Sequence, residues 1–255
     1  MTTPLITLCT DFGTVDGYVA QMKGVILSIC PNAHITDITH DIAPQDVRAG
    51  AWVISAVAPR FPESTIHVGV VDPGVGGRRR GIILCALGHI FIGPDNGLFS
   101  PFLDGVEEAY ELIAPQGSSA TFHGRDLFAP AAARIAAGEN PANLAAPLRD
   151  PARLDEWTKT ISGERVEGRV THIDRFGNVI TNLRPEDFVK RTKSLFVHGR
   201  DAPKDLPILE TYCRVKEDAA LWLVGSGGFY ELAVRNASAA ERFDIRRGDV
   251  VSGSL

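Results

Sequence analysis

Two carboxylates follow the first predicted strand in a glycine-containing turn. Asp11 and Asp16 lie in the segment TDFGTVDG, between an apolar run and a helical pattern. Carboxylates at a strand end can accept hydrogen bonds from a ribose diol or an ammonium group, whereas they would repel a phosphate. A helix cap would account for the same residues. The turn has only two glycines and no G-x-G-x-x-G or Walker pattern, so we do not expect it to bind pyrophosphate.

A second polar turn follows the third predicted strand. Asp72 begins the segment DPGVGGRRR, which contains Arg79. This composition allows a buried Asp–Arg pair that fixes a polar reactant, or a tight turn with solvated arginines. Further on, His123 in TFHGRD precedes a predicted helix start that Asp126 could cap. A lone histidine is more often structural than catalytic, so these residues taken singly are not specific.

The last third of the chain holds two more polar loops. The segment HIDRFGNV is typical of a strand, a turn and a second strand, and turn chemistry alone explains its Asp, Gly and Asn. The segment GSGGF is rich in backbone N–H groups that can meet a carboxylate or a purine edge. The candidate binding residues of this region are Asp174, Asn178, Ser226, Phe229, Arg235 and Ala237.

One cluster near the N-terminus has residue types that suit a divalent cation. It comprises Asp37, His40, Asp41 and Asp46. Carboxylates and imidazole are suitable ligands, but the cluster has one histidine and no second histidine at helical spacing. We therefore expect no metal site.

Composition excludes several classes of protein. Of the 255 residues, 44% are hydrophobic and 22% are charged, which fits a globular chain rather than a disordered one or a coiled coil. The net charge of −5, with no basic run longer than three, disfavours nucleic acid as a partner. We also expect neither a signal peptide nor a membrane span, because the N-terminal residues lack the pattern of the one and no apolar run is long enough for the other. Four cysteines without metal or redox spacing predict free thiols in a reducing cytoplasm.

The elements that must position these residues change in character along the chain. Short apolar strands alternate with helical patterns at first, which predicts an N-terminal α/β domain with a central sheet over residues 1–150. Its expected strands are 5–9, 33–38, 65–71, 81–87 and 89–92, and its expected helices are 19–29, 47–58 and 126–137. Residues 151–164 have linker composition. Short strands then predict a smaller all-β, barrel-like domain over 165–255.

Seven segments together are far more specific than any one of them. In chain order they are TDFGTVDGYVAQMKGVI, ITDITHDIAPQDVRAGAWV, TIHVGVVDPGVGGRRRGI, IFIGPDNGLF, TFHGRDLFAPAAA, HIDRFGNVITN and GSGGFYELAVRNASAA. This set resembles the S-adenosyl-L-methionine hydroxide adenosyltransferase family, which is related to the S-adenosyl-L-methionine-dependent fluorinases and chlorinases. The resemblance runs from about Leu5 to Val251.

The resemblance implies an activity and an assembly. Water would cleave S-adenosyl-L-methionine (SAM) at C5′ of the ribose, giving adenosine and L-methionine, with SAM as substrate and no cofactor. The implied assembly is a homotrimer. Its active sites would lie between the N-terminal domain of one subunit and the C-terminal domain of its neighbour.

The resemblance also assigns binding roles to single residues. Asp11 matches the carboxylate that holds the ribose hydroxyls, and Asp16 and Asp174 match positions around the methionine ammonium group. Asn178 matches the asparagine that binds adenine. The remaining positions lie in the last segment, where Phe229 matches an apolar contact, Arg235 and Ala237 match backbone contacts to the purine, and Ser226 matches the region of the amino-acid end. An arginine that halogenases have there is replaced by Gly228, so the anchor of the substrate carboxylate is left open.

The family's water-handling triad matches Asp72, Arg79 and His123. Because a neutral thioether leaves from a sulfonium, the reaction needs an aligned oxygen nucleophile rather than a general acid. Gly124 matches the position at which the halogenases have a serine that contacts the halide. This replacement and the charge of Asp72 favour water over fluoride or chloride as the nucleophile. The alternatives are a SAM-dependent halogenase, a non-catalytic sensor of SAM or adenosine, and a metal-dependent hydrolase.

Overall fold

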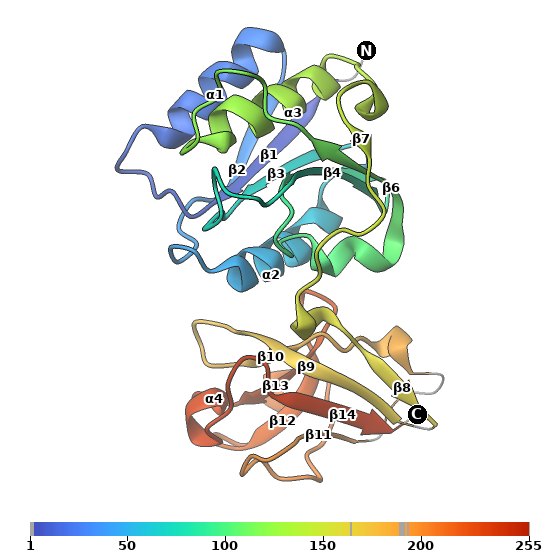
Figure 1. Ribbon diagram of the computed structural model, residues 1–255. Helices are drawn as coiled ribbons and strands as arrows, with labels where there is room; N and C mark the ends of the chain where they lie inside the picture. The colour runs from blue at the N-terminus through green and yellow to red at the C-terminus, as the bar shows by residue number, and fades with distance from the viewer. Residues whose placement is uncertain (1–2, 164, 189–191, 193, 255) are drawn as a thin grey trace. The chain divides into compact units, whose positions relative to one another are not determined.

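The chain folds into two compact units, each with its own sheet and core. The computed structural model describes residues 3–163, 165–188, 192 and 194–254. The units are Met1–Leu154 and Asp155–Leu255. In the first unit a mixed sheet lies between helices, and in the second strands predominate over a few short helices (Figure 1).

The first unit is built on a seven-stranded sheet with the order β2-β1-β3-β5-β4-β6-β7. Its strands are β1 (Leu5–Thr10), β2 (His34–Thr39), β3 (Ile66–Val70), β4 (Gly81–Ala86), β5 (His89–Pro94), β6 (Val106–Leu112) and β7 (Ala146–Pro147). Strands β2, β1, β3 and β5 run parallel, and the others pair antiparallel. Because Thr10 pairs with Val70, the loops after β1 and β3 leave the sheet side by side.

Helices cover both faces of this sheet. Figure 1 shows α1 (Tyr18–Ile29) and α3 (Ala129–Ala136) on one face and α2 (Val47–Val57) on the other. Helix α1 buries Val19, Met22 and Ile26, the helical spacing that predicts it. The Asp46 side chain caps α2 by accepting from the Ala49 N–H at 3.0 Å. In the described part of the chain, no helix combines the length and apolarity that a bilayer span requires.

The structure divides the predicted linker 151–164 between the two units. The buried Asp95 carboxylate accepts hydrogen bonds from the Ala152 N–H at 2.7 Å and from Arg80 Nε at 2.8 Å, which ties this segment to the first sheet. The Leu154 N–H donates to Ser100 Oγ at 2.7 Å. From Asp155 the chain belongs to the second unit, and Glu164 lies outside the described residues.

In its described residues, the second unit is an antiparallel sheet with one short α-helix, α4 (Ala239–Arg242), and three single-turn 3-10 helices. Its strands are β8 (Thr160–Ser162), β9 (Arg165–Ile173), β10 (Val179–Thr181), β11 (Leu195–Val197), β12 (Ala220–Val224), β13 (Tyr230–Val234) and β14 (Val250–Ser254). Their order is β11-β14-β9-β10-β13-β12, with β8 also paired to β9. The sheet curls into a half-barrel around a core that includes Val170, Trp222 and Leu232. The predicted fold class, α/β followed by a smaller all-β unit, is confirmed.

Candidate functional site

A cavity opens beside the ends of β1 and β3. Its volume is about 400 Å³. The residues that line it come from the loops after these two strands, from the start of α1, from residues 44–45 and from the segment before α3. They are Asp11, Phe12, Tyr18, Pro44, Gln45, Val70, Asp72, Pro73, Val75, Thr121, Phe122, His123 and Gly124. Three of the predicted site residues, Asp11, Asp72 and His123, therefore share one cavity.

Arg79 joins Asp72 to His123. Its Nε donates to Asp72 Oδ1 at 2.9 Å and to Oδ2 at 3.0 Å, and its Nη2 also donates to Oδ2. The same Nη2 lies 2.7 Å from His123 Nδ1. The Asp72 and Arg79 side chains are only 5% and 10% exposed. The predicted triad is thus a connected group in which one guanidinium orients both the carboxylate and the imidazole.

The environment of His123 favours its neutral form. Burial and the Arg79 guanidinium lower the pKa of His123, outweighing the attraction of Asp72 and Asp126. Because a guanidinium can only donate, His123 Nδ1 accepts its hydrogen bond, and the ring proton of the neutral form lies on Nε2. The site therefore combines an ion pair with an uncharged imidazole.

Gly76 allows the Asp72 turn to approach the His123 loop. Its φ is +72°, and a Cβ at this position would lie 2.2 Å from the carbonyl oxygen of Ala120. Only glycine fits such a left-handed position against a neighbouring backbone. Gly76 thus permits close packing of the Asp72 turn against Ala120, in the segment that precedes His123.

The two carboxylates of the first turn have different surroundings. Asp11 lines the cavity, and its Oδ2 accepts from the Gln45 N–H at 2.8 Å. Asp16 is exposed and does not line the cavity. Within the first unit, Asp11 is therefore placed beside the triad and Asp16 is not.

In the second unit, Asp174 and Asn178 form one turn between β9 and β10. Asp174 Oδ1 accepts from the Phe176 and Asn178 N–H groups, both at 2.9 Å, and Oδ2 accepts from Asn178 Nδ2 at 3.0 Å. Gly177 has φ +80°, and its missing side chain leaves room for Ser238. The turn chemistry expected from the sequence is present, and Asn178 is held rigidly by its acidic neighbour.

The other predicted binding residues of this unit lie around β13. Phe229 is buried, with the Arg184 guanidinium 3.9 Å from its ring centroid, and Ser226 is exposed. Both backbone groups of Arg235 are hydrogen-bonded, its N–H to Ala219 and its C=O to Asp218. The Ala237 N–H donates to the Val234 carbonyl at 3.2 Å.

Three of the four residues weighed as metal ligands, Asp37, His40 and Asp46, have other side-chain partners. Asp37 accepts from Lys23 Nζ at 2.6 Å and lies 3.1 Å from His40 Nε2. Thr10 Oγ1 lies 2.9 Å from His40 Nδ1, while Asp46 caps α2. Within the ranges that the structure describes, no group of three His, Cys, Asp or Glu side chains is arranged to hold a metal ion.

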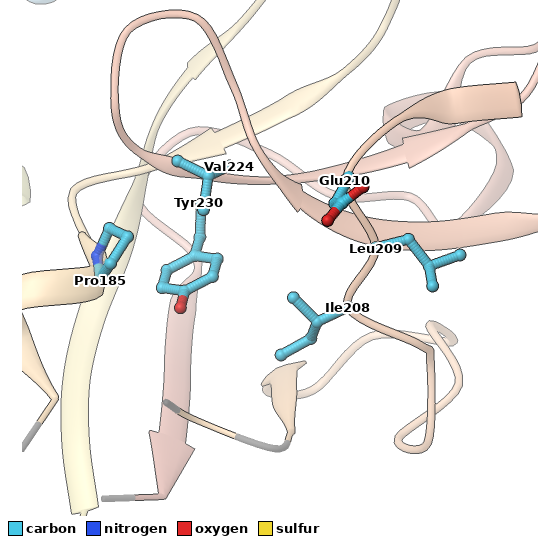
Figure 2. Close-up of a pocket in the computed structure, with 6 residues that line it drawn as sticks. All are labelled: Pro185, Ile208, Leu209, Glu210, Val224 and Tyr230. Atoms are coloured by element: carbon cyan, nitrogen blue, oxygen red, sulfur yellow. The ribbon is translucent and has the colours of Figure 1, made fainter. Parts of the chain in front are cut away.

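A separate cavity of about 510 Å³ lies in the second unit. Figure 2 shows Ile208 and Tyr230 facing this hollow from opposite sides, with Pro185, Leu209, Glu210 and Val224 around it. Glu210 is the one ionisable side chain among the six apart from the Tyr230 phenol, and none of the predicted site residues lines the hollow. The triad cavity is therefore the better candidate for chemistry.

Three aromatic residues of the triad cavity were not predicted as site residues. The ring centroids of Phe12 and Phe122 lie 5.8 Å apart, those of Tyr18 and Phe122 5.3 Å, and those of Phe12 and Tyr18 5.9 Å. Each lies one or two residues from a predicted site residue, as the segments DF, DGY and FH show. This proximity is the signal that sequence reasoning left unused.

Comparison with known proteins places the whole chain in one group. Residues 6–145 match the SAM hydroxide adenosyltransferase N-terminal domain, and residues 168–252 match its C-terminal domain. An (R)-S-adenosyl-L-methionine hydrolase of Salinispora arenicola is 38% identical, covering 97% of this chain and 96% of the relative. A fluorinase of Actinoplanes sp. is 30% identical, covering 98% and 97%. The crystal structure of an uncharacterized conserved protein from Thermotoga maritima superposes with a TM-score of 0.83 at 31% identity, covering 98% of this chain and 100% of that one. The chain belongs to the SAM hydroxide adenosyltransferase family.

Proposed function

We propose that this protein hydrolyses SAM at C5′ of the ribose. The water oxygen bonds to C5′, the C5′–S bond breaks with its electron pair going to sulfur, and one water proton is released. The products are adenosine and L-methionine. Family membership and the relatives named as hydrolases support this reaction. The observation that carries it is the hydrogen-bonded group Asp72–Arg79–His123, of which Asp72 and His123 line a cavity together with Asp11.

Within the proposed reaction, Asp72 accepts the hydrogen bond from the attacking water. Arg79 fixes the carboxylate through two nitrogens, so an acceptor oxygen keeps one position at the cavity wall. A guanidinium beside the nucleophile also stabilises hydroxide character as the proton moves to Asp72. The leaving thioether is neutral, so the site needs no general acid.

His123 acts as a hydrogen-bond donor in this scheme. Arg79 occupies Nδ1, so the neutral ring offers Nε2–H to the nucleophile oxygen. A charged imidazolium would repel the cationic substrate, and the lowered pKa of His123 avoids this cost near neutral pH. Proton transfer is thereby assigned to Asp72 and orientation of the oxygen to His123.

The remaining contacts follow the family pattern. Asp11 holds the ribose hydroxyls, and Asp16 and Asp174 attract the methionine ammonium group. On the second unit, Asn178 and the loops with Ser226, Phe229, Arg235 and Ala237 bind adenine and the amino-acid end. We propose a homotrimer in which these two sets come from neighbouring subunits, located in the cytoplasm and acting without a cofactor.

A halogenase is the second candidate, because a fluorinase is among the relatives. A halide would bind where the proposed water binds, beside the Asp72 carboxylate and Gly124. A carboxylate repels a halide, and glycine offers no side-chain hydroxyl to solvate it. These two residues favour water as the nucleophile.

Product analysis tests the proposed function. The purified protein is incubated with SAM, with and without chloride or fluoride, and the products are separated and identified by mass spectrometry. Adenosine and methionine in every buffer support hydrolysis. A halogenated nucleoside that depends on the halide supports the halogenase, and bound SAM without turnover supports the sensor.

Asp72 variants test the assigned base. Asp72→Ala and the isosteric Asp72→Asn should abolish turnover, because the carboxylate accepts the proton of the nucleophile. SAM should still bind, but more weakly, because the Arg79 charge is then uncompensated. Asp104→Asn is the matched control, since its side chain is 71% exposed and does not line the triad cavity. An active Asp72→Asn enzyme would rule out the assignment.

Subunit mixing tests the shared site. Asp72→Asn and Asn178→Ala proteins, each inactive alone, are mixed under conditions that exchange subunits. If neighbouring chains share each site, some mixed trimers contain an intact site and activity returns. A monomeric mass in solution, or no recovery despite proven exchange, contradicts the proposed assembly.

A further inference from the structure

The rings of Phe12, Tyr18 and Phe122 form an aromatic cluster that contacts two cavities. One is the triad cavity of about 400 Å³. The other, of about 340 Å³, is lined by the same three rings together with Gln21, Ser119, Thr121 and Arg125. The Tyr18–Phe122 and Phe12–Phe122 pairs meet edge to face, at 87° and 75°. This geometry turns ring faces, which carry negative potential, in several directions.

One ring of the cluster already holds a cation. The Arg125 guanidinium carbon lies 5.0 Å from the Phe122 centroid, within the range of a cation–π contact. Arg125 is held there by Gln21 Oε1 at 2.9 Å and by the Asp126 carboxylate. Arg125 and Gln21 line the second cavity and not the triad cavity. All three rings also line the triad cavity with Asp72 and His123, but Phe122 is only 8% exposed, whereas Tyr18 is 46% exposed.

We infer that this aromatic cluster recognises the sulfonium of the substrate, with Tyr18 as its accessible member. The inference rests on the proposed function and adds a specificity determinant to it. In-line attack places the sulfur opposite the nucleophile, with C5′ between them. Since Asp72 and His123 hold the nucleophile and Asp11 the ribose, the sulfur lies elsewhere on the cavity wall. Among the lining residues, the aromatic cluster is the group whose chemistry suits a weakly hydrated organic cation.

This role has a kinetic signature. As C5′–O forms and C5′–S breaks, the sulfur loses its positive charge, so a cation–π contact is strongest with bound substrate and weakens toward the transition state. An interaction of this kind lowers KM without raising kcat. Removing the Tyr18 ring should therefore raise KM and leave kcat unchanged or slightly higher.

The test compares Tyr18→Leu with Tyr18→Phe. Leucine keeps apolar contact and removes the ring, whereas phenylalanine keeps the ring and removes only the hydroxyl. Affinities for SAM and for its neutral thioether, S-adenosyl-L-homocysteine, are measured by calorimetry in the Asp72→Asn background, where SAM is expected to survive. Tyr18→Leu should weaken SAM binding roughly three- to tenfold, the range of one partly exposed cation–π contact, and change thioether binding less than twofold. Tyr18→Phe should match the parent.

Three results would overturn the inference. They are equal weakening of both ligands by Tyr18→Leu, an effect of Tyr18→Phe as large as that of Tyr18→Leu, and a fall in kcat at unchanged KM in the otherwise wild-type enzyme. The proposed function fails separately, through absence of SAM turnover by the wild-type protein. In that case the ratio of SAM to thioether affinity still decides whether the aromatic cluster recognises the cation.

Discussion

Replacing Arg79 with methionine should damage both stability and activity, because it leaves the buried Asp72 carboxylate without its partner. The Asp72 side chain is 5% exposed, and both of its carboxylate oxygens accept hydrogen bonds from Arg79. Breaking a buried ion pair by removing one partner costs about 3–5 kcal/mol. Since Asp72 borders a cavity that water can enter, we expect the lower end, about 3 kcal/mol, in the free energy of unfolding.

A double-mutant cycle separates this electrostatic cost from loss of packing. Asp72→Asn combined with Arg79→Met removes both charges, so the double variant should lose about 1 kcal/mol or less, because apolar or neutral replacements of a buried pair are often tolerated. The two single losses should then exceed the double loss by about 2 kcal/mol or more. Turnover should stay at least roughly a hundredfold below wild type in all three variants, because each removes part of the group that we propose accepts the proton.

Urea unfolding followed by far-ultraviolet circular dichroism is the appropriate assay. Helices α1, α2 and α3 belong to the first unit, whereas the four-residue α4 is the only α-helix among the described residues of the second. The α-helical signal therefore reports mainly on the unit that holds the site. Arg79→Lys is the matched control. Lysine keeps the positive charge but loses the planar guanidinium, which contacts both Asp72 and His123. Additive losses in the cycle, or a fully active Arg79→Met protein, would refute the reasoning.

Two further predictions concern residues outside the chemistry itself. Gly76→Ala should unfold or inactivate the protein, because at φ +72° its Cβ would lie 2.2 Å from the Ala120 carbonyl oxygen. Gly17→Ala is the control and should be tolerated, because the space around Gly17 is open. Thermal melting and turnover assays check both variants. Burial and then His89 lower the pKa of His67 from 6.5 to about 3, so the unfolded chain binds more protons than the folded one between these values. The contribution of neutral His67 to the free energy of unfolding should therefore be fully present above pH 6.5 and decrease toward pH 3 by up to about 1.4 kcal/mol per pH unit. His67→Gln should reduce this pH dependence in acid unfolding experiments. An unchanged dependence would contradict the prediction.

The strands and helices of the first unit were largely predictable because their apolar patterns are local. Strands 5–9, 81–87 and 89–92 match β1, β4 and β5, and the turn at Gly88 joins β4 to β5 as expected. Strand β6 was missed because its sequence, VEEAYEL, mixes exposed glutamates with buried residues. The helix predicted from Asp126 begins as a wider π-helical turn over Gly124–Phe128, and α3 follows it. Such a turn depends on packing, which propensity does not report.

The arginine triplet shows where sequence reasoning about the site stops. Three consecutive arginines have three different environments. Arg79 binds Asp72 and His123, Arg80 binds Asp95 and Asp150, and Arg78 is exposed. Spacing alone allowed either a buried pair or solvated arginines, and both occur. The tertiary position of each partner carboxylate decides which arginine is paired and which is exposed. A local sequence pattern carries no information about that position.

The charge balance of the cavity is a property of the whole arrangement rather than of any one motif. Asp72 and Arg79 compensate each other, and His123 tends toward its neutral form, so the Asp11 carboxylate leaves the cavity with a net negative formal charge. Such a field attracts a sulfonium and opposes a halide, while a water molecule is indifferent to it. When the C–S bond breaks, the positive charge at sulfur disappears, and the attraction that held the substrate there is lost with it. The same electrostatics therefore favours entry of a cationic substrate, attack by water and release of a neutral thioether.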